Sequence, residues 1–235
     1  MLATFAIASF LACSTAAASA SEVDSEPACP PNLVEVGGTG EPVRLVPQRK
    51  GFAYVSGDCI VDTPLPDGYP RPTAPGMLEI KAYPVVRRAQ VEGKGDRDDG
   101  MRGRGSTAAF WPLFRHIQQR DIAMTSPVET DYSDDGWTMA FLYRQTDQGP
   151  EGQAGSVEVF DAPPVTVIAI GVRGDLDSSG LNERIESLRS WVESSGDWVV
   201  AGDPRKLSYN GPDVRAARRW HEVQLPIQPA DATAP

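Results

Sequence analysis

The sequence predicts an α+β protein in which an antiparallel sheet curls into a distorted β-barrel with two helices, preceded by an irregular N-terminal arm. Three observations lead to this prediction. Short alternating strand patterns recur through the second two thirds of the chain, two segments have helical periodicity, and these patterns occur in the same order twice. The 235 residues are enough for one large domain with an extension.

The repeated order begins with two similar segments, 78–86 and 157–165, which both carry Glu at the second position and a proline five residues later. Each is followed by a second strand, a Gly-containing loop, a helix, a strand with a breaker and a strand opened by tryptophan. This order predicts two β-β-α-β-β repeats. Most connections are too short for crossovers, so the pairing should be antiparallel. Curling into a barrel would remove exposed edges and leave a cleft beside the helices.

The two helices differ in how clearly the sequence defines them. The second has an apolar stripe from Leu181 to Val192, possible caps at 177–179 and Gly196 at its end. The first is predicted over about 106–119, with its regular turns starting near Phe110, which would place Pro112 in the first turn, where no hydrogen bond is lost. Its expected core stripe is Phe110, Phe114 and Ile117.

The N-terminal 76 residues divide into two expected segments. Residues 1–20 are uncharged and end in Ala-Ser-Ala, as in a secretory signal, which predicts export to the periplasm or the exterior. A lipoprotein cleavage at Cys13 is the alternative. Residues 21–76 are rich in Pro and Gly and form the arm, where Cys29 and Cys59 should pair in an oxidising compartment. The alternative is two free buried thiols.

The main domain is expected at 77–227, with a disordered tail at 228–235. The formal net charge of −10 argues against a nucleic-acid partner, because phosphate binding requires clustered positive charge. No segment after the first 20 residues is apolar for long enough to insert stably in a membrane. A Gly-x-Ser-x-Gly elbow, a His-Glu-x-x-His helix and a Walker loop are absent, so no catalytic residues are assigned.

Several motifs resemble the SOUL heme-binding family over residues 77–227. They are Tyr-Pro-Val-Val-Arg-Arg at 83–88, Phe-Trp-Pro-Leu-Phe-Arg-His-Ile at 110–117, Ile-Ala-Met-Thr-Ser-Pro-Val at 122–128, and Tyr-Asn-Gly-Pro followed by Arg-Arg-Trp-His-Glu-Val at 209–223. The resemblance implies a distorted barrel of two repeats. It also implies that heme or free porphyrin is bound in a surface cleft against a helix.

A porphyrin is a flat apolar plate with two carboxylates, so it needs aromatic walls and a few cations. The first helix offers these groups, and a methionine after it adds a soft contact. Some family members ligate iron through a histidine on an early strand of the first repeat, but residues 80–91 contain none. His116 is the substitute candidate, and no other metal ligand is expected. The expected ligand-binding residues are Phe110, Trp111, Phe114, Arg115, His116 and Met124.

These observations predict an exported, non-catalytic protein that binds a tetrapyrrole reversibly, with its oligomeric state left open. One alternative is a binding module for another amphipathic small molecule. Another is a small-ligand hydrolase or heme-modifying enzyme, which would need an acid–base pair such as Glu129 or Glu222 near Tyr143 or Tyr209. In a third, residues 60–76 of the chain itself fill the cleft.

Overall fold

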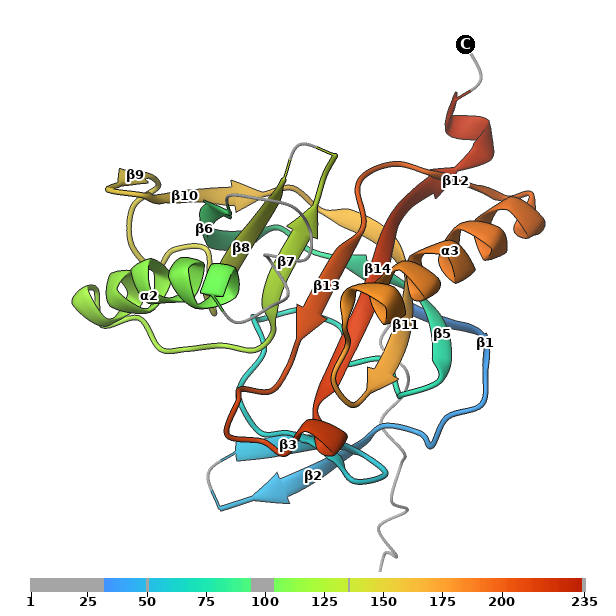
Figure 1. The fold of residues 1–235 in the computed structure, drawn as a ribbon, viewed down its shortest axis with the longest axis horizontal. Helices are drawn as coiled ribbons and strands as arrows, with labels where there is room; N and C mark the ends of the chain where they lie inside the picture. The colour runs from blue at the N-terminus through green and yellow to red at the C-terminus, as the bar shows by residue number, and fades with distance from the viewer. Residues whose placement is uncertain (1–31, 50, 94–103, 135, 234–235) are drawn as a thin grey trace, which may run out of the picture.

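The computed structural model describes residues 32–49, 51–93, 104–134 and 136–233, which form a mostly antiparallel sheet with two long helices (Figure 1). The elements are β1 (Leu33–Gly38), β2 (Arg44–Gln48), β3 (Gly51–Ser56), β4 (Cys59–Val61), β5 (Met77–Tyr83), β6 (Val86–Gly93), α2 (Arg104–Gln119), β7 (Val128–Tyr132), β8 (Trp137–Leu142), β9 (Gly152–Ala154), β10 (Val157–Ala162), β11 (Val165–Arg173), α3 (Ser178–Ser195), β12 (Trp198–Val200), β13 (Arg205–Ser208), η1 (Ala216–Arg218), β14 (Trp220–Pro229) and η2 (Ala230–Thr233). The main sheet has the order β1-β5-β11-β14-β13-β7-β8-β6-β10-β9, with β12 on β14, and a separate sheet has the order β2-β3-β4.

Two long ribbons of chain supply four strands of the main sheet, two near each end of the strand order. One is β5 followed by β6, and the other is β10 followed by β11. They pair antiparallel in one register along their length, since Val165 lies opposite Tyr83 and Ala162 lies opposite Val86. Each ribbon passes a proline between its two strands, Pro84 in one and Pro163 in the other, where the ladder is interrupted.

The sheet does not close into the predicted barrel. Within the part of the chain that the structure describes, the strand order ends at β1 on one side and at β9 on the other. β1 pairs with the outer side of β5 and β9 with the outer side of β10, so these strands occupy the edges through which closure would occur. The antiparallel pairing and the α+β class are confirmed.

The first helix, α2, begins two residues earlier than predicted, and Pro112 lies inside it rather than in its first turn. The proline has no N–H, so one helical hydrogen bond is missing there. The helix packs on β6, β8 and β10. Its buried apolar residues are Ala109, Leu113 and Ile117, whereas Phe110 and Phe114 are only partly buried. The predicted core stripe is therefore confirmed at Ile117, whereas Phe110 and Phe114 pack against the edge of the core and Ala109 and Leu113 take the fully buried positions.

The second helix, α3, confirms its predicted limits and caps. The carboxylate of Asp177 accepts a hydrogen bond from the Gly180 N–H at 2.8 Å, and Gly196 ends the helix in the left-handed region at φ 71°. These contacts satisfy backbone groups that have no partner within the helix. The helix packs on β11, β12 and β14.

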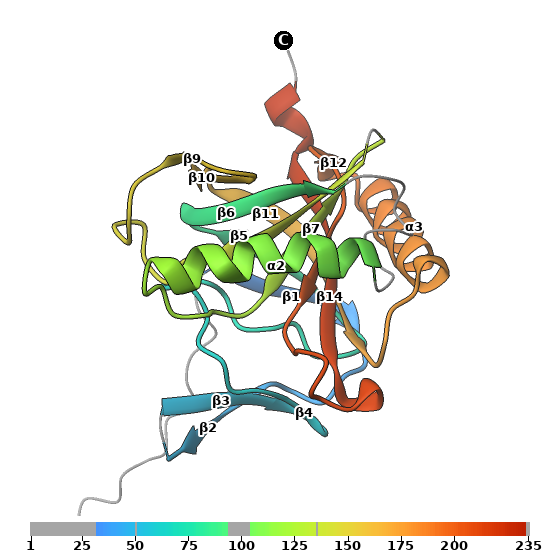
Figure 2. The same cartoon turned by 60° about the vertical axis from the view of Figure 1, so that its left-hand side comes forward.

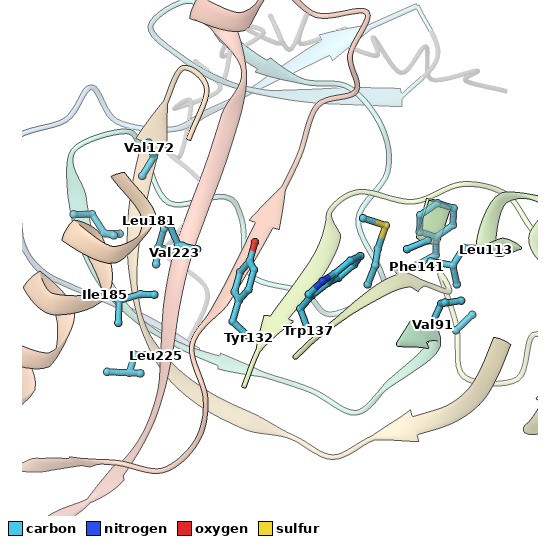
Figure 3. Packing of buried hydrophobic residues seen from close by; sticks show 14 of the residues in the cluster. Val91, Leu113, Tyr132, Trp137, Phe141, Val172, Leu181, Ile185, Val223 and Leu225 are labelled. Carbon is cyan, nitrogen blue, oxygen red and sulfur yellow. The ribbon is translucent and has the colours of Figure 1, made fainter. Parts of the chain in front are cut away.

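Both helices cover the same face of the main sheet. Figure 3 shows Leu181 and Ile185 of α3 close to Val223 on one side, and Leu113 of α2 close to Phe141 on the other. Tyr132 and Trp137 lie between these two groups, so one apolar layer continues beneath both helices. Because successive strand side chains point to opposite faces, the alternate residues face away from the helices. We call that second side of the main sheet the helix-free face.

The N-terminal arm is more regular than predicted. It contributes β1 to the edge of the main sheet and β2, β3 and β4 to the small sheet, which lies below the main sheet in both views (Figures 1 and 2). The chain pairs regularly here because segments such as 43–46 and 52–55 are apolar enough to form strands. Residues 62–76 then cross the helix-free face.

The disulfide prediction is not supported. Cys59 is a free, fully buried thiol, and Cys29 lies outside the described residues. Burial raises the pKa of the Cys59 thiol, and the nearby Asp58 charge adds to this effect. The predicted signal segment, 1–20, also lies outside the described residues. Residues 228–233 of the predicted disordered tail instead form the end of β14 and η2, with Gln228 and Pro229 paired with β12, and residues 234–235 lie outside the described residues.

Candidate functional site

The aromatic residues predicted to bind a ligand form one cluster on α2. The ring centroids of Phe110 and Phe114 are 5.6 Å apart and nearly parallel, and Trp111 packs edge-on against both at 5.9 Å. Phe110 also contacts Phe141 of β8 edge-on at 5.1 Å, which anchors the cluster to the sheet. The Trp111 residue is 56% exposed, so an apolar ring system faces solvent at this point.

His116 does not face solvent beside this cluster. It is 4% exposed, and its Nε2 lies 2.8 Å from the hydroxyl oxygen of Tyr143, just after β8. Burial lowers the pKa of His116, and the positive charge of Arg120 lowers it further. The imidazole is therefore neutral near pH 7, and its Nε2 is occupied by a protein partner.

The other two predicted ligand-binding residues occupy different environments. Arg115 is exposed on α2, where its guanidinium is accessible to an anionic group. Met124 is half-buried and packs against the main core. The structure thus brings Phe110, Trp111 and Phe114 together, places Arg115 on the same helix, and turns His116 to Tyr143.

A pocket of about 200 Å³ lies on the other side of Tyr143. It is lined by Pro66, Asp67, Val85, Val86, Arg87, Tyr143, Arg144, Gln145 and Thr146. Residues 83–88 were predicted to be a family motif but not the wall of a pocket. The local sequence pattern carries no signal for this pocket, because the exposure of Val85 follows from the fold.

The two arginines of this pocket are already paired with carboxylates. Arg87 donates to both oxygens of Asp161, at 2.7 and 2.8 Å, and to Glu151 at 3.0 Å. The hydrogen bond from Arg87 lowers the pKa of Asp161. Arg144 donates to Asp67 at 3.0 Å, with both side chains about half exposed. The pocket therefore presents apolar carbon and neutralised charge rather than a free cation.

A buried charge cluster lies on the helix-free face and was not anticipated. Lys81 and Glu222 are completely buried, and the Lys81 ammonium donates to a Glu222 oxygen at 2.9 Å. The same carboxylate accepts hydrogen bonds from Tyr209, Thr73 and Gln224 at 2.6 to 2.7 Å. Burial alone would raise the pKa of Glu222, but Lys81 and the hydrogen bonds from Tyr209 and the Thr73 N–H outweigh it and lower the pKa.

The cluster continues towards β7 through a second carboxylate. Glu129 lies 3.6 Å from guanidinium nitrogens of both Arg88 and Arg205. Arg205 donates to Gln224 at 2.8 Å, and its guanidinium lies 4.9 Å from the centre of the Tyr83 ring. Burial, followed by the Glu222 charge, raises the pKa of Tyr83 well above 10. Positive and negative groups alternate through the cluster, which stabilises their charged forms.

One acid–base pair considered from the sequence is present here, since Tyr209 donates to Glu222 at 2.7 Å. Tyr209 is 5% exposed and Glu222 is completely buried, so a substrate does not reach the pair in this conformation. Glu79 and Lys81, like Glu222 and Gln224, lie two residues apart on one face of an otherwise apolar strand, a pattern that equally fits a strand with that face in water and so does not indicate a buried cluster. Among the described residues, no three His, Cys, Asp or Glu side chains are placed to hold a metal ion, and no helix has the length and apolarity to span a membrane.

Comparisons of structure show which known folds are similar. EcmrR in a cryo-EM structure of its complex with DNA superposes with a TM-score of 0.51 and 16% identity, over 64% of this chain and 57% of that one. The crystal structure of the EcmrR C-terminal domain gives a TM-score of 0.50 and 16% identity, over 64% of this chain and 96% of that one. A structure described as a hydrolase from Listeria innocua gives 0.48 and 16% identity, over 67% and 94% of the two chains. At these identities the likeness concerns the fold alone.

The sequence comparison is more specific. A search of curated proteins finds no significant match. The model of the SOUL heme-binding protein family matches residues 71–226, which is more than half of the chain and agrees with the motifs at 83–88, 110–117 and 122–128. The chain belongs to the SOUL heme-binding protein family.

Proposed function

We propose that the protein binds heme or a related tetrapyrrole against the aromatic cluster of α2, in an exported and non-catalytic role such as carriage or buffering. The observation that supports this most is the exposed Trp111 ring, held edge-on by Phe110 and Phe114. Large apolar rings that stay in contact with water mark binding surfaces. Family membership supports a tetrapyrrole as the ligand.

The residues present fit the plane and the carboxylates of a porphyrin better than its iron. When bound, the group supplies a flat apolar surface, two carboxylates and a metal with axial positions. Phe110, Trp111 and Phe114 offer rings for stacking, and the exposed Arg115 offers a cation for a carboxylate. His116 would have to leave Tyr143 and its buried position to reach a metal. We therefore infer binding without axial ligation by His116.

The same proposal includes export of the chain and its origin by duplication. The uncharged segment 1–20 supports export, with cleavage after Ala20. The order β5-β6-α2-β7-β8 followed by β10-β11-α3-β13-β14 supports an origin by duplication of one unit.

The test is a titration of the mature protein with hemin and, in parallel, with iron-free protoporphyrin, following the Soret band and the quenching of tryptophan fluorescence. We expect one-to-one binding at micromolar concentrations or tighter, with similar affinities for the two ligands. Trp111→Ala should weaken both about 2- to 10-fold, the range expected from loss of one aromatic contact. Phe52→Ala is the matched control, because Phe52 is 61% exposed on β3 of the separate small sheet.

Two results would decide against the proposal. One is an unchanged Soret band at tens of micromolar protein. The other is an equal loss of affinity in the Trp111 and Phe52 variants. A strong preference for hemin over protoporphyrin would refute only the inference that the ligand binds without ligation of its iron by His116.

A second candidate function is binding of a smaller amphipathic molecule, which the pocket beside Tyr143 favours. Its wall combines Pro66, Val85 and Val86 with the paired Arg87 and Arg144, and about 200 Å³ is too little for a whole macrocycle. A thermal-shift screen with small aromatic acids tests this, because a ligand of the folded state raises its melting temperature. Val85→Glu should abolish any such shift, and Trp111→Ala should leave it intact.

A further inference from the structure

A proline-rich segment of the chain lies across the helix-free face, and we call residues 63–76 the strap. It contains Pro64, Pro66, Pro70, Pro72 and Pro75. Apart from one isolated bridge between Pro75 and Gly171, it makes no strand pairing with the sheet. The strap is therefore held by side chains and single backbone groups, in the way that a bound peptide is held.

The first anchor of the strap is aromatic. The ring of Tyr69 packs edge-on against Tyr83, with centroids 4.8 Å apart, and the Tyr69 hydroxyl donates to Glu129 at 3.4 Å. Burial, followed by the Glu129 charge, raises the pKa of Tyr69 well above 10, so the hydroxyl keeps its proton. Tyr69 thus fills a site that has an aromatic wall and an acceptor at its end.

The second anchor is charged. A guanidinium nitrogen of Arg71 lies 2.9 Å from Glu79, whose side chain is completely buried. The backbone carbonyl of Arg71 accepts a hydrogen bond from Lys81 at 2.7 Å. The sheet therefore recognises both the side chain and the backbone of this residue.

The third anchor is the backbone of Thr73. Its N–H donates to Glu222 at 2.6 Å, and its carbonyl accepts from the indole N–H of Trp220 at 2.7 Å. The sheet beneath is shaped for close approach, because a Cβ at Gly171 would lie 2.2 Å from the carbonyl oxygen of Ala74. The three anchors fall on alternate residues, 69, 71 and 73, with prolines between them.

Aromatic walls together with a carboxylate that pairs with arginine are typical of grooves that recognise proline-rich peptides. Prolines limit the conformations of the free segment, so less entropy is lost when it docks. We propose that the helix-free face is a recognition groove for a Tyr-Pro-Arg-Pro-Thr type of segment. The strap occupies this groove within the chain, and a proline-rich segment of a partner protein with the same chemistry takes its place. This inference is independent of tetrapyrrole binding on α2.

The strap competes strongly because it is tethered. A short tether gives it an effective concentration on the order of millimolar. A free peptide of the same sequence should therefore bind the intact chain poorly. It should bind well once the anchors of the strap are removed.

The experiment uses the mature chain carrying Tyr69→Ala and Arg71→Ala, and a fluorescent peptide with the sequence of residues 63–76. By anisotropy, we expect the variant to bind this peptide at least 10-fold more tightly than the unsubstituted chain does. A peptide with the same two replacements should bind the variant at least 10-fold more weakly than the native peptide. Phe52→Ala, which changes an exposed residue outside the strap, should behave as the unsubstituted chain.

The proposal is overturned if the folded variant, checked by circular dichroism and a cooperative melt, binds the native peptide no better than the unsubstituted chain does. Hydrogen exchange on the unsubstituted chain keeps the idea testable if the variant does not fold. The amides of Thr73 and Gly76 should exchange at least 10-fold faster than those of Ile168 and Val223, which lie in the core ladder. Equal rates would show that the strap opens only with global unfolding, and would overturn a replaceable strap.

Discussion

Replacing Lys81 with methionine should be among the most destabilising single changes in this protein. The Lys81 ammonium is completely buried, donates to Glu222 at 2.9 Å and to the carbonyl of Arg71 at 2.7 Å, and lies 3.7 Å from Glu79. Methionine has a similar length and fills the same space. It removes the charge that compensates two buried carboxylates, so the cost is electrostatic rather than steric.

The size of the effect follows from that geometry. Removal of one partner from a buried ion pair costs about 3 to 5 kcal/mol, because the other charge stays buried without compensation. With a urea m-value of about 2 kcal/mol/M, this loss corresponds to a fall of roughly 1.5 to 2.5 M in the unfolding midpoint. Arg144→Ala is the comparison, because the Arg144–Asp67 pair is about half exposed and such pairs contribute about 1 kcal/mol or less.

Urea unfolding followed by circular dichroism and tryptophan fluorescence gives both values. The double variant Lys81→Met/Glu222→Leu should lose at least about 1 kcal/mol less than the two single changes together, because it removes both charges of one pair. A loss below 1 kcal/mol for Lys81→Met would refute the reasoning, as would strict additivity in the double variant.

Three further changes test other parts of the structure. Burial lowers the pKa of His221 to about 4, against 6.5 in an unfolded chain, so the unfolded state gains a proton first as the pH falls. The free energy of unfolding should therefore fall by about 3 kcal/mol between pH 6.5 and 4. Urea titrations at a series of pH values measure this fall, and His221→Asn should flatten it. Gly171→Ala should cost about 1 to 3 kcal/mol in thermal unfolding, because its Cβ meets a backbone oxygen of the strap, whereas Gly37→Ala has open space around it and should cost much less. Asp177→Ala removes the N-cap of α3 and should cost about 1 kcal/mol, and an unchanged melting temperature would contradict the assigned cap.

The parts of the fold governed by local pattern could be predicted from the sequence. The limits and caps of α3 follow from Asp177, Gly196 and a regular apolar stripe, and all of them were correct. The family was also predictable, because its motifs are short, contiguous and in order. Local signals of this kind do not depend on what packs against them.

The charge cluster could not be predicted, because its burial depends on a distant segment. Glu79 and Lys81 alternate with apolar residues on β5, which is the pattern of a strand with one face in water. In the structure the strap covers that face and leaves both side chains completely buried. Residues 60–76 are one expected filler of the cleft, but the anchors that hold them lie in three separate strands, β5, β7 and β14.

The errors at the candidate site have a similar cause. The sequence predicts a core stripe of Phe110, Phe114 and Ile117 and offers His116 as a candidate ligand for iron. In the structure Leu113 and His116 face inward, and Tyr143 offers the imidazole a hydrogen-bond partner. A long-range partner of this kind leaves no mark in the local pattern.

The pairing of the two long ribbons has a consequence for how the chain reaches this fold. Leu78 lies opposite Ile170, and Val86 lies opposite Ala162, so one side of the first ribbon has no partner until the second has been synthesised, whereas its other side pairs with β1 and β8. Contacts between such distant parts of a sequence form slowly, because a large loop must close before any of them is gained. During synthesis on the ribosome, the early strands must therefore wait with apolar residues exposed, and this interval is when the nascent chain most needs protection from aggregation.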